Sequence, residues 1–376
     1  MKKGLVTFVA AMVAMSGACF CGNATTAEAM QLSSAEHLAG KFVAVSRSVE
    51  TDGSETTVYR NVAEYKNTLA RNYRLSEEAR AKLLYKSMGV PEDQIDAMEK
   101  DKLLEVFDYT ECTQTTNYIA TINGENENIS RAEMVNALSR SDDLTLEGNA
   151  LVAENLSLVQ DEPMVLNSNI QENVSADGYM RMTISTYKTT GSLEGRTYYD
   201  VNVTNEWLKI PEMLRRDVLV IKTDNATHDE TYIESGYYEC MWLETTSTGA
   251  YVNRYGIRND IRKGQVAYSS YYNCDTDNLK LDYSAGLGCV ALRVYLERVG
   301  NSNIKGHNYQ VTIRSSLFTK YSLYNTDAHV QGVYGHKKSS WGSDISISVT
   351  IGGVLSLGTS IGTISEYNSN SMSIYY

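Results

Sequence analysis

The sequence predicts an α+β protein that is mainly β, with a β-sandwich body that follows a small helical N-terminal region. Roughly ten segments after residue 143 alternate apolar and polar side chains between Gly, Asn and Asp turns, as the strands of a sandwich do. Helical periodicity is strong only before that point. We therefore predict a signal peptide over 1–29, an α-rich region over 30–143 and a β-sandwich-like domain over 144–376.

The first 29 residues have the layout of a secretory signal peptide. Lys2 and Lys3 give a positive start, 5–15 is apolar, and small residues stand at Ala27 and Ala29. The apolar run is shorter than the roughly 20 residues that a membrane-spanning helix needs. We expect cleavage after Ala29 and a secreted, extracellular protein without a transmembrane segment.

Cys19 offers an alternative to free secretion, because a lipid could be attached to its thiol. The three residues before it, 16–18, are small, as they are in lipoprotein signals. The aliphatic residue that usually stands three positions before such a cysteine is missing, since Ser16 occupies that place. Secretion therefore remains the prediction, with anchoring through Cys19 as the alternative.

The charge and the aromatic content restrict the class of partner. The chain has a net charge of -12 and lacks the basic surface that nucleic acid binding needs, so we predict no nucleic acid partner. It has 27 tyrosines but 5 phenylalanines, and tyrosine suits half-exposed strand faces as well as contact surfaces. A glycan or a cell-surface protein is the predicted partner. The candidate binding residues are Trp207, Trp242, Tyr237 and Tyr238.

Four cysteines follow the signal peptide: Cys112, Cys240, Cys274 and Cys289. An even number in an exported protein favours disulfides, and four cysteines allow three pairings. Cys274 and Cys289 enclose a short loop, so we predict that bridge first and then one between Cys112 and Cys240. Free buried cysteines are the alternative.

The segment from 41 to 73 contains two predicted elements. Residues 41–50 read as a short strand. Residues 55–73 read as a helix, because apolar side chains recur every three or four positions at Val58, Val62, Tyr65, Leu69 and Tyr73.

The clearest helical block runs from 75 to 109. Ser76 is placed to cap a helix that ends near Gly89, and Pro91 suits the first turn of a second, short helix. A third short helix follows near Leu103. Two helices joined by a tight turn also occur in DNA-binding proteins, but the predominance of acidic residues and the predicted export argue against that function.

Two further local signals precede residue 143. Asn123-Gly124 separates two alternating segments and predicts a tight hairpin. Ser130 and Glu133 have the spacing of a capping box and predict the start of a short helix.

The strongest β pattern runs from Tyr179 to Lys222. Alternation over 179–187 and again over 199–207 predicts a hairpin, and Pro211 predicts a bend before the apolar run 218–221. We expect these three strands to form one β-meander.

The order of these features resembles a group of secreted, uncharacterised proteins of Gram-positive bacteria. The resemblance rests on the Gly89-Val90-Pro91 break between helices, on the strand that ends in 207–211, and on Arg215 and Asp217 after it. It implies export and a β-rich body, and it carries over no catalytic residue.

The last 33 residues alternate Ser or Thr with aliphatic residues around Gly352-Gly353, which predicts a hairpin. Two ordinary sandwich strands would have this pattern. The membrane-inserting arm of a β-pore toxin would have it as well, with apolar side chains toward lipid and hydroxyls toward the lumen.

The sequence contains no HExxH, CxxC or P-loop motif. Asp327, His329 and His336 could meet on adjacent strands as a metal site, and Cys240 lies within a strand, where its thiol is not activated. We predict no catalytic residue, no metal and no cofactor. The predicted function is a secreted, non-catalytic interaction or structural protein. The alternatives are a secreted hydrolase of envelope or host polymers and a membrane-active toxin that uses the C-terminal hairpin.

Overall fold

The computed structural model describes the following residues: 41–62, 75–98, 100–122, 125–141, 146–158, 176–193, 196–209, 216–229, 235–245, 251–254, 258–262, 280–284, 289–295, 310–324, 327–337, 346–349, 355–358 and 366–374. In these ranges the protein is mainly β, with antiparallel sheets and few helices, which confirms the predicted mainly β character. The predicted signal peptide and Cys19 lie outside the described residues.

The chain divides into two compact units. One comprises 1–43 and 60–107, and the other comprises 44–59 and 108–376. The first contains three short helices, α3 (Glu77–Ser87), α4 (Glu92–Ala97) and α5 (Lys100–Leu104), and the 3₁₀ turn η2 (Glu105–Asp108) follows α5. The boundaries drawn from the sequence at 29 and 143 remain predictions.

The ends of α3 follow from its terminal residues. The Ser76 hydroxyl accepts a hydrogen bond from the Ala79 amide at 3.2 Å, which satisfies one of the free amides of the first turn. Gly89, with φ of +75°, follows the last turn, and the Val90 amide donates to the Tyr85 carbonyl at 3.2 Å. Pro91 is the N-cap of α4 rather than its first residue.

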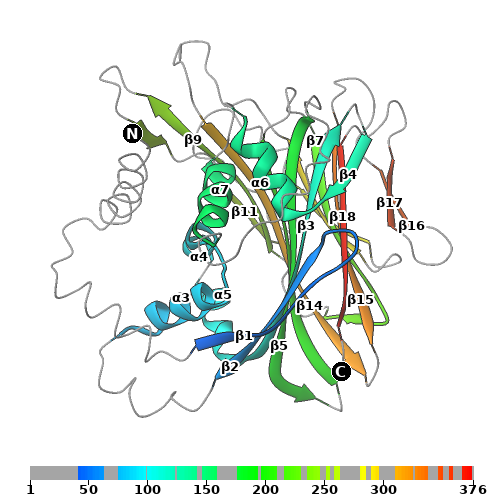
Figure 1. The fold of residues 1–376 in the computed structure, drawn as a ribbon. Helices are drawn as coiled ribbons and strands as arrows, with labels where there is room; N and C mark the ends of the chain where they lie inside the picture. The colour runs from blue at the N-terminus through cyan, green and yellow to red at the C-terminus, as the bar shows by residue number, and fades with distance from the viewer. Residues whose placement is uncertain are drawn as a thin grey trace. The chain divides into compact units, whose positions relative to one another are not determined.

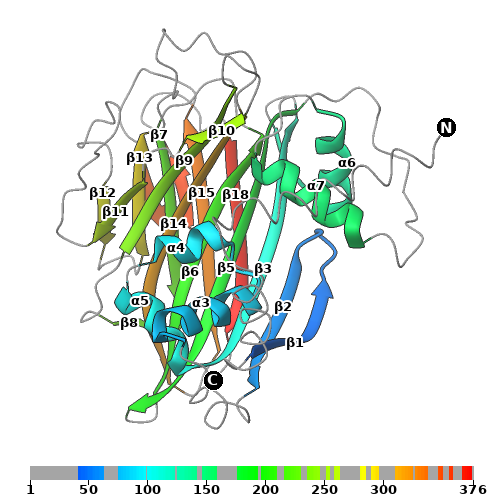
Figure 2. The same cartoon turned by 90° about the vertical axis from the view of Figure 1, so that its left-hand side faces the viewer.

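The second unit contains most of a sheet of eleven strands (Figures 1 and 2). Its main path runs β1 (Lys41–Val49), β2 (Glu55–Val62), β3 (Tyr109–Ile122), β5 (Ala176–Leu193), β6 (Arg196–Lys209), β14 (Gln310–Tyr324), β9 (Ser235–Thr245) and β10 (Tyr251–Arg254). Three shorter strands pair off this path: β4 (Glu125–Ile129) with β3, β8 (Thr227–His228) with β14, and β11 (Arg258–Arg262) with β9.

A second sheet has five strands, in the order β12 (Lys280–Ser284), β13 (Cys289–Tyr295), β7 (Arg216–Asp224), β15 (Ala328–Lys337) and β18 (Glu366–Ile374). A separate pair, β16 (Ser346–Val349) and β17 (Leu355–Gly358), forms a two-stranded sheet.

The two larger sheets contribute side chains to one hydrophobic core. From the large sheet it contains Met180, Met182, Ile184, Val201, Val203 and Trp207, and from the smaller sheet Leu219, Ile221, Val290, Leu292, Val330 and Tyr334. These side chains recur at every second position of their strands, because a strand turns alternate residues to one face. At Gly332 of β15 an added Cβ would lie 2.8 Å from Val203 Cγ1 of β6, so glycine permits the close approach of the sheets there.

The opposite face of the large sheet is covered at one end by α6 (Arg131–Ser139) and α7 (Leu146–Leu158), which lie together beside β3 and β5 (Figure 2). The core under them contains Tyr118, Ala120, Met134, Leu138, Leu151, Tyr179 and Leu208. The predicted capping box begins α6, since the Glu133 carboxylate accepts from the Ser130 amide at 2.8 Å and the Ser130 hydroxyl accepts from the Glu133 amide.

Three predicted hairpins are confirmed. β3 and β4 pair with Ile122 opposite Glu125, β5 and β6 pair with Leu193 opposite Arg196, and β16 and β17 pair with Val349 opposite Leu355. Gly352 and Gly353 of the last turn lie outside the described residues.

Three expectations about elements are wrong. Residues 55–62 form β2 instead of a helix, because pairing within the sheet overrides a spacing of apolar residues that a helix would share. A helix, α7, forms after Leu144, where only β structure was expected. β7 joins the smaller sheet and not a meander with β5 and β6, since 218–221 is buried on both faces and needs cover on both.

Candidate functional site

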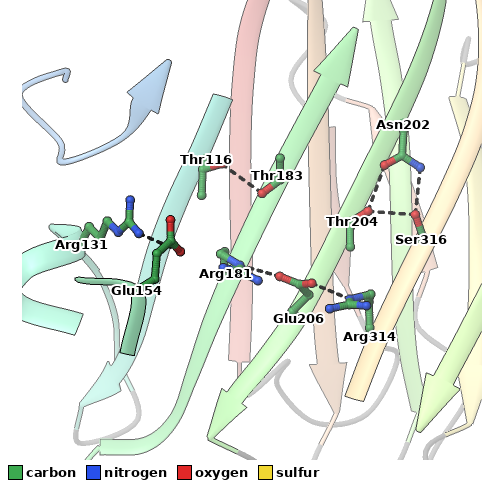
Figure 3. Close-up of polar contacts among 10 residues, drawn as sticks. All are labelled: Thr116, Arg131, Glu154, Arg181, Thr183, Asn202, Thr204, Glu206, Arg314 and Ser316. Carbon is green, nitrogen blue, oxygen red and sulfur yellow. Dashed lines mark hydrogen bonds and ion pairs between the residues drawn. The ribbon is translucent and has the colours of Figure 1, made fainter. Parts of the chain in front are cut away.

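One face of the large sheet is lined by polar side chains (Figure 3). It is the face opposite the shared core, because the residues concerned alternate with the core residues of β3, β5, β6 and β14. We call it the polar face and define it by Thr116, Arg181, Thr183, Asn202, Thr204, Glu206, Arg314 and Ser316.

A row of three charges crosses the polar face. Strand pairing places Arg181 of β5 opposite Glu206 of β6, and Glu206 opposite Arg314 of β14. Arg181 Nε lies 2.5 Å from Glu206 Oε2, and Arg314 Nε lies 2.5 Å from Glu206 Oε1. Each carboxylate oxygen thus accepts from a different arginine, as Figure 3 shows. The side chains of Glu206 and Arg314 are 3% and 1% exposed, so these two are buried, whereas the Arg181 side chain is 16% exposed.

The two arginines determine the protonation state of the carboxylate. Burial alone would raise the pKa of Glu206, but the charges of Arg181 and Arg314, and the hydrogen bonds from both, lower that pKa to about 2. The carboxylate is therefore ionised at neutral pH and held on both sides. It is unsuited to act as a general acid or base, which needs a pKa near the working pH.

A second row, of hydroxyl and amide groups, runs beside the charged row. Thr116 and Thr183 share a hydrogen bond at 3.0 Å between β3 and β5. Between β6 and β14, Asn202 Nδ2 donates to Ser316 Oγ at 2.8 Å, and Thr204 Oγ1 lies 2.8 Å from the same Ser316 oxygen. The Thr204 hydroxyl also donates to Asn202 Oδ1 at 2.9 Å. The last three residues form a closed triangle of buried polar groups, which joins two central strands of the sheet.

Asp200 of β6 is also engaged within the protein. Tyr109 Oη donates to Asp200 Oδ2 at 2.6 Å, and Lys320 Nζ lies 3.2 Å from Asp200 Oδ1. The Tyr109 ring stacks on Tyr187 with centroids 4.8 Å apart. These contacts join β3, β5, β6 and β14 through side chains as well as through the backbone.

A buried histidine and aspartate lie in the smaller sheet. His336 Nδ1 of β15 is 2.5 Å from Asp217 Oδ1 of β7, and both side chains are fully buried. The His336 and Trp207 rings pack edge to face with their centroids 5.4 Å apart, and Trp207 Nε1 donates to Tyr334 Oη at 2.9 Å. The four residues form two hydrogen-bonded pairs and are at most 2% exposed, so an external substrate has no access to them.

Asp327, His329 and His336, the alternative metal site weighed from the sequence, do not come together. His329 and His336 lie on the same strand, β15, and His336 pairs with Asp217. Seven residues of extended strand separate the two histidines by on the order of 23 Å. In the described part of the chain no group of three His, Cys, Asp or Glu residues could hold a metal ion.

Trp207 was predicted to line a contact surface, and the structure corrects this. It is 1% exposed and packs in the core between the sheets. A Cβ added at Gly178 would lie 2.7 Å from Trp207 Cζ3, so the glycine makes room for the ring. Trp207 lies on the same face of β6 as Val201 and Val203, and this face packs in the core.

The other three candidate binding residues lie on β9. Strand pairing places Tyr237, Tyr238 and Trp242 opposite Ser316, Ser315 and Val311 of β14. Their side chains lie outside the described part of the structure. Their role in binding remains a prediction.

The cysteine predictions have different outcomes. Cys112 is free and buried, and burial raises the pKa of its thiol well above the usual value, so the thiol is not an activated nucleophile. Three strands separate β3 from β9, so Cys112 and Cys240 lie at least about 19 Å apart across the sheet, too far for a disulfide. The predicted bridge between them is therefore wrong. Cys289 lies on β13 and Cys274 lies outside the described residues, so the bridge between those two remains a prediction.

No family model and no curated protein matches the sequence. Solved structures with some similarity include the membrane-inserted form of the Clostridium perfringens NetB toxin, with 8% identity, a TM-score of 0.24 and coverage of 52% of this chain and 91% of that chain. They also include a collagen-binding domain of a Staphylococcus aureus adhesin, with 8% identity, a TM-score of 0.20 and coverage of 50% of this chain and 95% of that chain. A third is a pore-forming protein, with 7% identity, a TM-score of 0.21 and coverage of 55% of this chain and 95% of that chain. TM-scores of this size do not establish a shared fold.

None of the helices in the described ranges has the length and apolar character needed to cross a membrane.

The charged row could not be identified from the sequence. Arg181, Glu206 and Arg314 do stand out of phase with the apolar residues of their strands, which placed each on a polar face. Their meeting depends on which strands are neighbours and in what register, and β6 and β14 are more than 100 residues apart in sequence. A single sequence carries no signal for that pairing.

Proposed function

We propose that the protein is a secreted, non-catalytic interaction or structural protein, with a β-sandwich body and a small helical N-terminal region. The sandwich is supported by two antiparallel sheets whose side chains share one core. Export is supported by the signal-like first 29 residues and by the resemblance to secreted proteins of Gram-positive bacteria.

The observation that carries the proposal is that the charged side chains of the polar face bond to one another. Side chains that could do chemistry there, Glu206 with Arg181 and Arg314, are bonded to one another across the strands, and Glu206 and Arg314 are buried. Such a network stiffens a wide sheet instead of opening a position for a substrate. A rigid sheet that carries loops and edges for contact is the architecture of many binding proteins.

The proposed contact surface is on and around β9, with Tyr237, Tyr238 and Trp242 as its candidate residues and a glycan or cell-surface protein as the partner. Aromatic residues with a polar end are enriched where proteins meet partners. Trp207 is not part of this surface, because it is buried.

The test is binding of the exported protein to an array of glycans and cell-surface proteins, with release of products from the same polymers followed in parallel. Saturable binding without turnover, weakened by Trp242→Ala and not by the control Leu156→Ala, is the expected result; Leu156 is an exposed apolar residue of α7. Turnover would overturn the proposal in favour of a secreted hydrolase, and dye release from liposomes would favour the toxin alternative.

A further inference from the structure

The large sheet ends at a strand that has one described neighbour. β1 is first in the strand order and pairs with β2, and no other described strand lies beyond it (Figure 2). In an antiparallel sheet such an edge strand leaves alternate amide and carbonyl groups free for pairing. Natural edge strands are usually shortened, bulged or covered, whereas β1 has nine residues.

The side chains of β1 are exposed on both faces after Phe42. In the part that belongs to the second unit, Val45 and Val49 are 50% and 64% exposed. Both are among the few large apolar side chains that the described part of the protein exposes. Arg47 lies between them on the same face and is also exposed. This face of β1 therefore presents a positive charge between two apolar side chains.

Arg47 has no acidic partner in the described part of the protein. Its charge acts on Tyr59 of β2, whose pKa is raised by burial and partly lowered by Arg47, and it forms no ion pair with a described residue. The positive charge on the edge is thus open to a partner.

The edge is held in place by a rigid turn. The Glu50 amide donates to the Ser54 carbonyl at 2.8 Å, and Asp52 Oδ1 accepts from the amide and the hydroxyl of Ser54 at 3.0 and 2.7 Å. Thr56 of β2 is joined to Thr115 of β3 by a hydrogen bond of 2.9 Å between their hydroxyls. An added strand would therefore meet a preformed edge and would not have to order it.

We propose that β1 binds an extended segment of a partner protein that adds a strand to the large sheet, with an acidic side chain opposite Arg47 and apolar side chains opposite Val45 and Val49. This inference rests on the proposed function and adds a site for a protein partner at the opposite end of the strand order from β9 and β10. The backbone of the added strand would supply hydrogen bonds, and the alternate side chains would supply specificity. The expected motif in the partner is five residues long, with apolar residues at the first and fifth positions, an acidic residue at the third, and any residue at the second and fourth.

A second copy of the chain fits this edge less well. Antiparallel pairing of two copies over 45–49 is centred on Arg47, so it would place the two Arg47 side chains directly opposite each other. Like charges at directly opposed positions are destabilising, whereas opposite charges stabilise the pairing. A cation on an edge strand therefore acts against self-association and favours an acidic partner.

The test uses two fluorescent nonapeptides with the central sequence Val-Thr-X-Thr-Val, in which X is glutamate or lysine, and measures their anisotropy with the full exported protein. We expect the glutamate peptide to bind about tenfold more tightly than the lysine peptide. Arg47→Glu should reverse this preference, and that reversal shows that the variant is folded. Arg140→Glu, the same change at an exposed arginine after α6, should leave the preference unaltered.

Equal binding of the two peptides, absence of binding by both, or a preference that Arg47→Glu does not alter would overturn the inference. A dimer in sedimentation that blocks peptide binding would also overturn it, in favour of a second copy. The array experiment reports on the β9 surface, so saturable array binding together with peptide results that overturn the inference would leave the proposed function standing while the role of β1 falls. Turnover on the array would overturn the proposed function by itself.

Discussion

Arg314 and Arg47 lie on strands of the same sheet but in opposite situations. Arg314 is in the middle of the sheet, 1% exposed, with its Nε 2.5 Å from Glu206. Arg47 is on the edge strand, exposed, without an ion pair among the described residues. A buried guanidinium must have a partner within the protein, because its desolvation is otherwise uncompensated. An exposed one is solvated by water and stays open to a partner outside.

The largest expected effect comes from removing the acid of the charged row. Glu206→Gln should lower the free energy of unfolding by about 3–5 kcal/mol, because it removes the buried negative charge that pairs with Arg314 and Arg181. Urea denaturation measures this. The matched control is Glu154→Gln, whose exposed side chain pairs with Arg131 at 3.0 Å and should cost less than about 1 kcal/mol. Equal costs for the two variants would contradict the comparison.

The same carboxylate predicts a dependence of stability on pH. The pKa of Glu206 is lowered to about 2 in the folded protein, so the unfolded chain binds a proton there more readily. The contribution of Glu206 is therefore fully present above its unfolded pKa of about 4.3 and is lost as the pH falls from there toward 2. Thermal denaturation between pH 6 and 2.5 should show this loss. Glu206→Gln should show a smaller loss over that range, and an unchanged slope in the variant would assign the effect to other groups.

A smaller effect is expected at the turn that presents the edge. Gly53 has φ of +84°, and an added Cβ would lie 3.2 Å from the Ile129 carbonyl oxygen. Gly53→Ala should therefore cost about 1–2 kcal/mol through the strained left-handed backbone. It should also weaken peptide binding at β1. Hydrogen exchange of the β1 amides would check it, and unaltered exchange would show that the turn does not hold the edge.

The smallest effect on stability is expected at the edge itself. Arg47→Gln should change the free energy of unfolding by less than about 0.5 kcal/mol, because an exposed side chain without an ion pair contributes little. Arg314→Gln is the matched variant in the sheet centre and should be far more destabilising. Similar values for the two, measured by urea denaturation, would show that burial does not explain the difference between these arginines.

Features that depend on neighbours in the chain could be predicted from the sequence. The Ser76 cap, the capping box of Ser130 and Glu133, and the hairpin at Asn123-Gly124 each depend on residues a few positions apart. Alternation in β5 and β6 likewise predicted their apolar and polar faces. It could not decide whether Trp207 faces another sheet or solvent, because an amphipathic strand has the same pattern in both cases.

The sequence by itself therefore determined the mainly β character, the caps and the hairpins, since these depend on short-range hydrogen bonds and on the two-residue period of a strand. The tertiary structure decided the rest. It separated Cys112 from Cys240 by three strands, buried Trp207 between two sheets, and placed Glu206 between Arg181 and Arg314. The physical reason is that the order and register of strands depend on contacts between distant segments, and each segment taken alone is compatible with several neighbours.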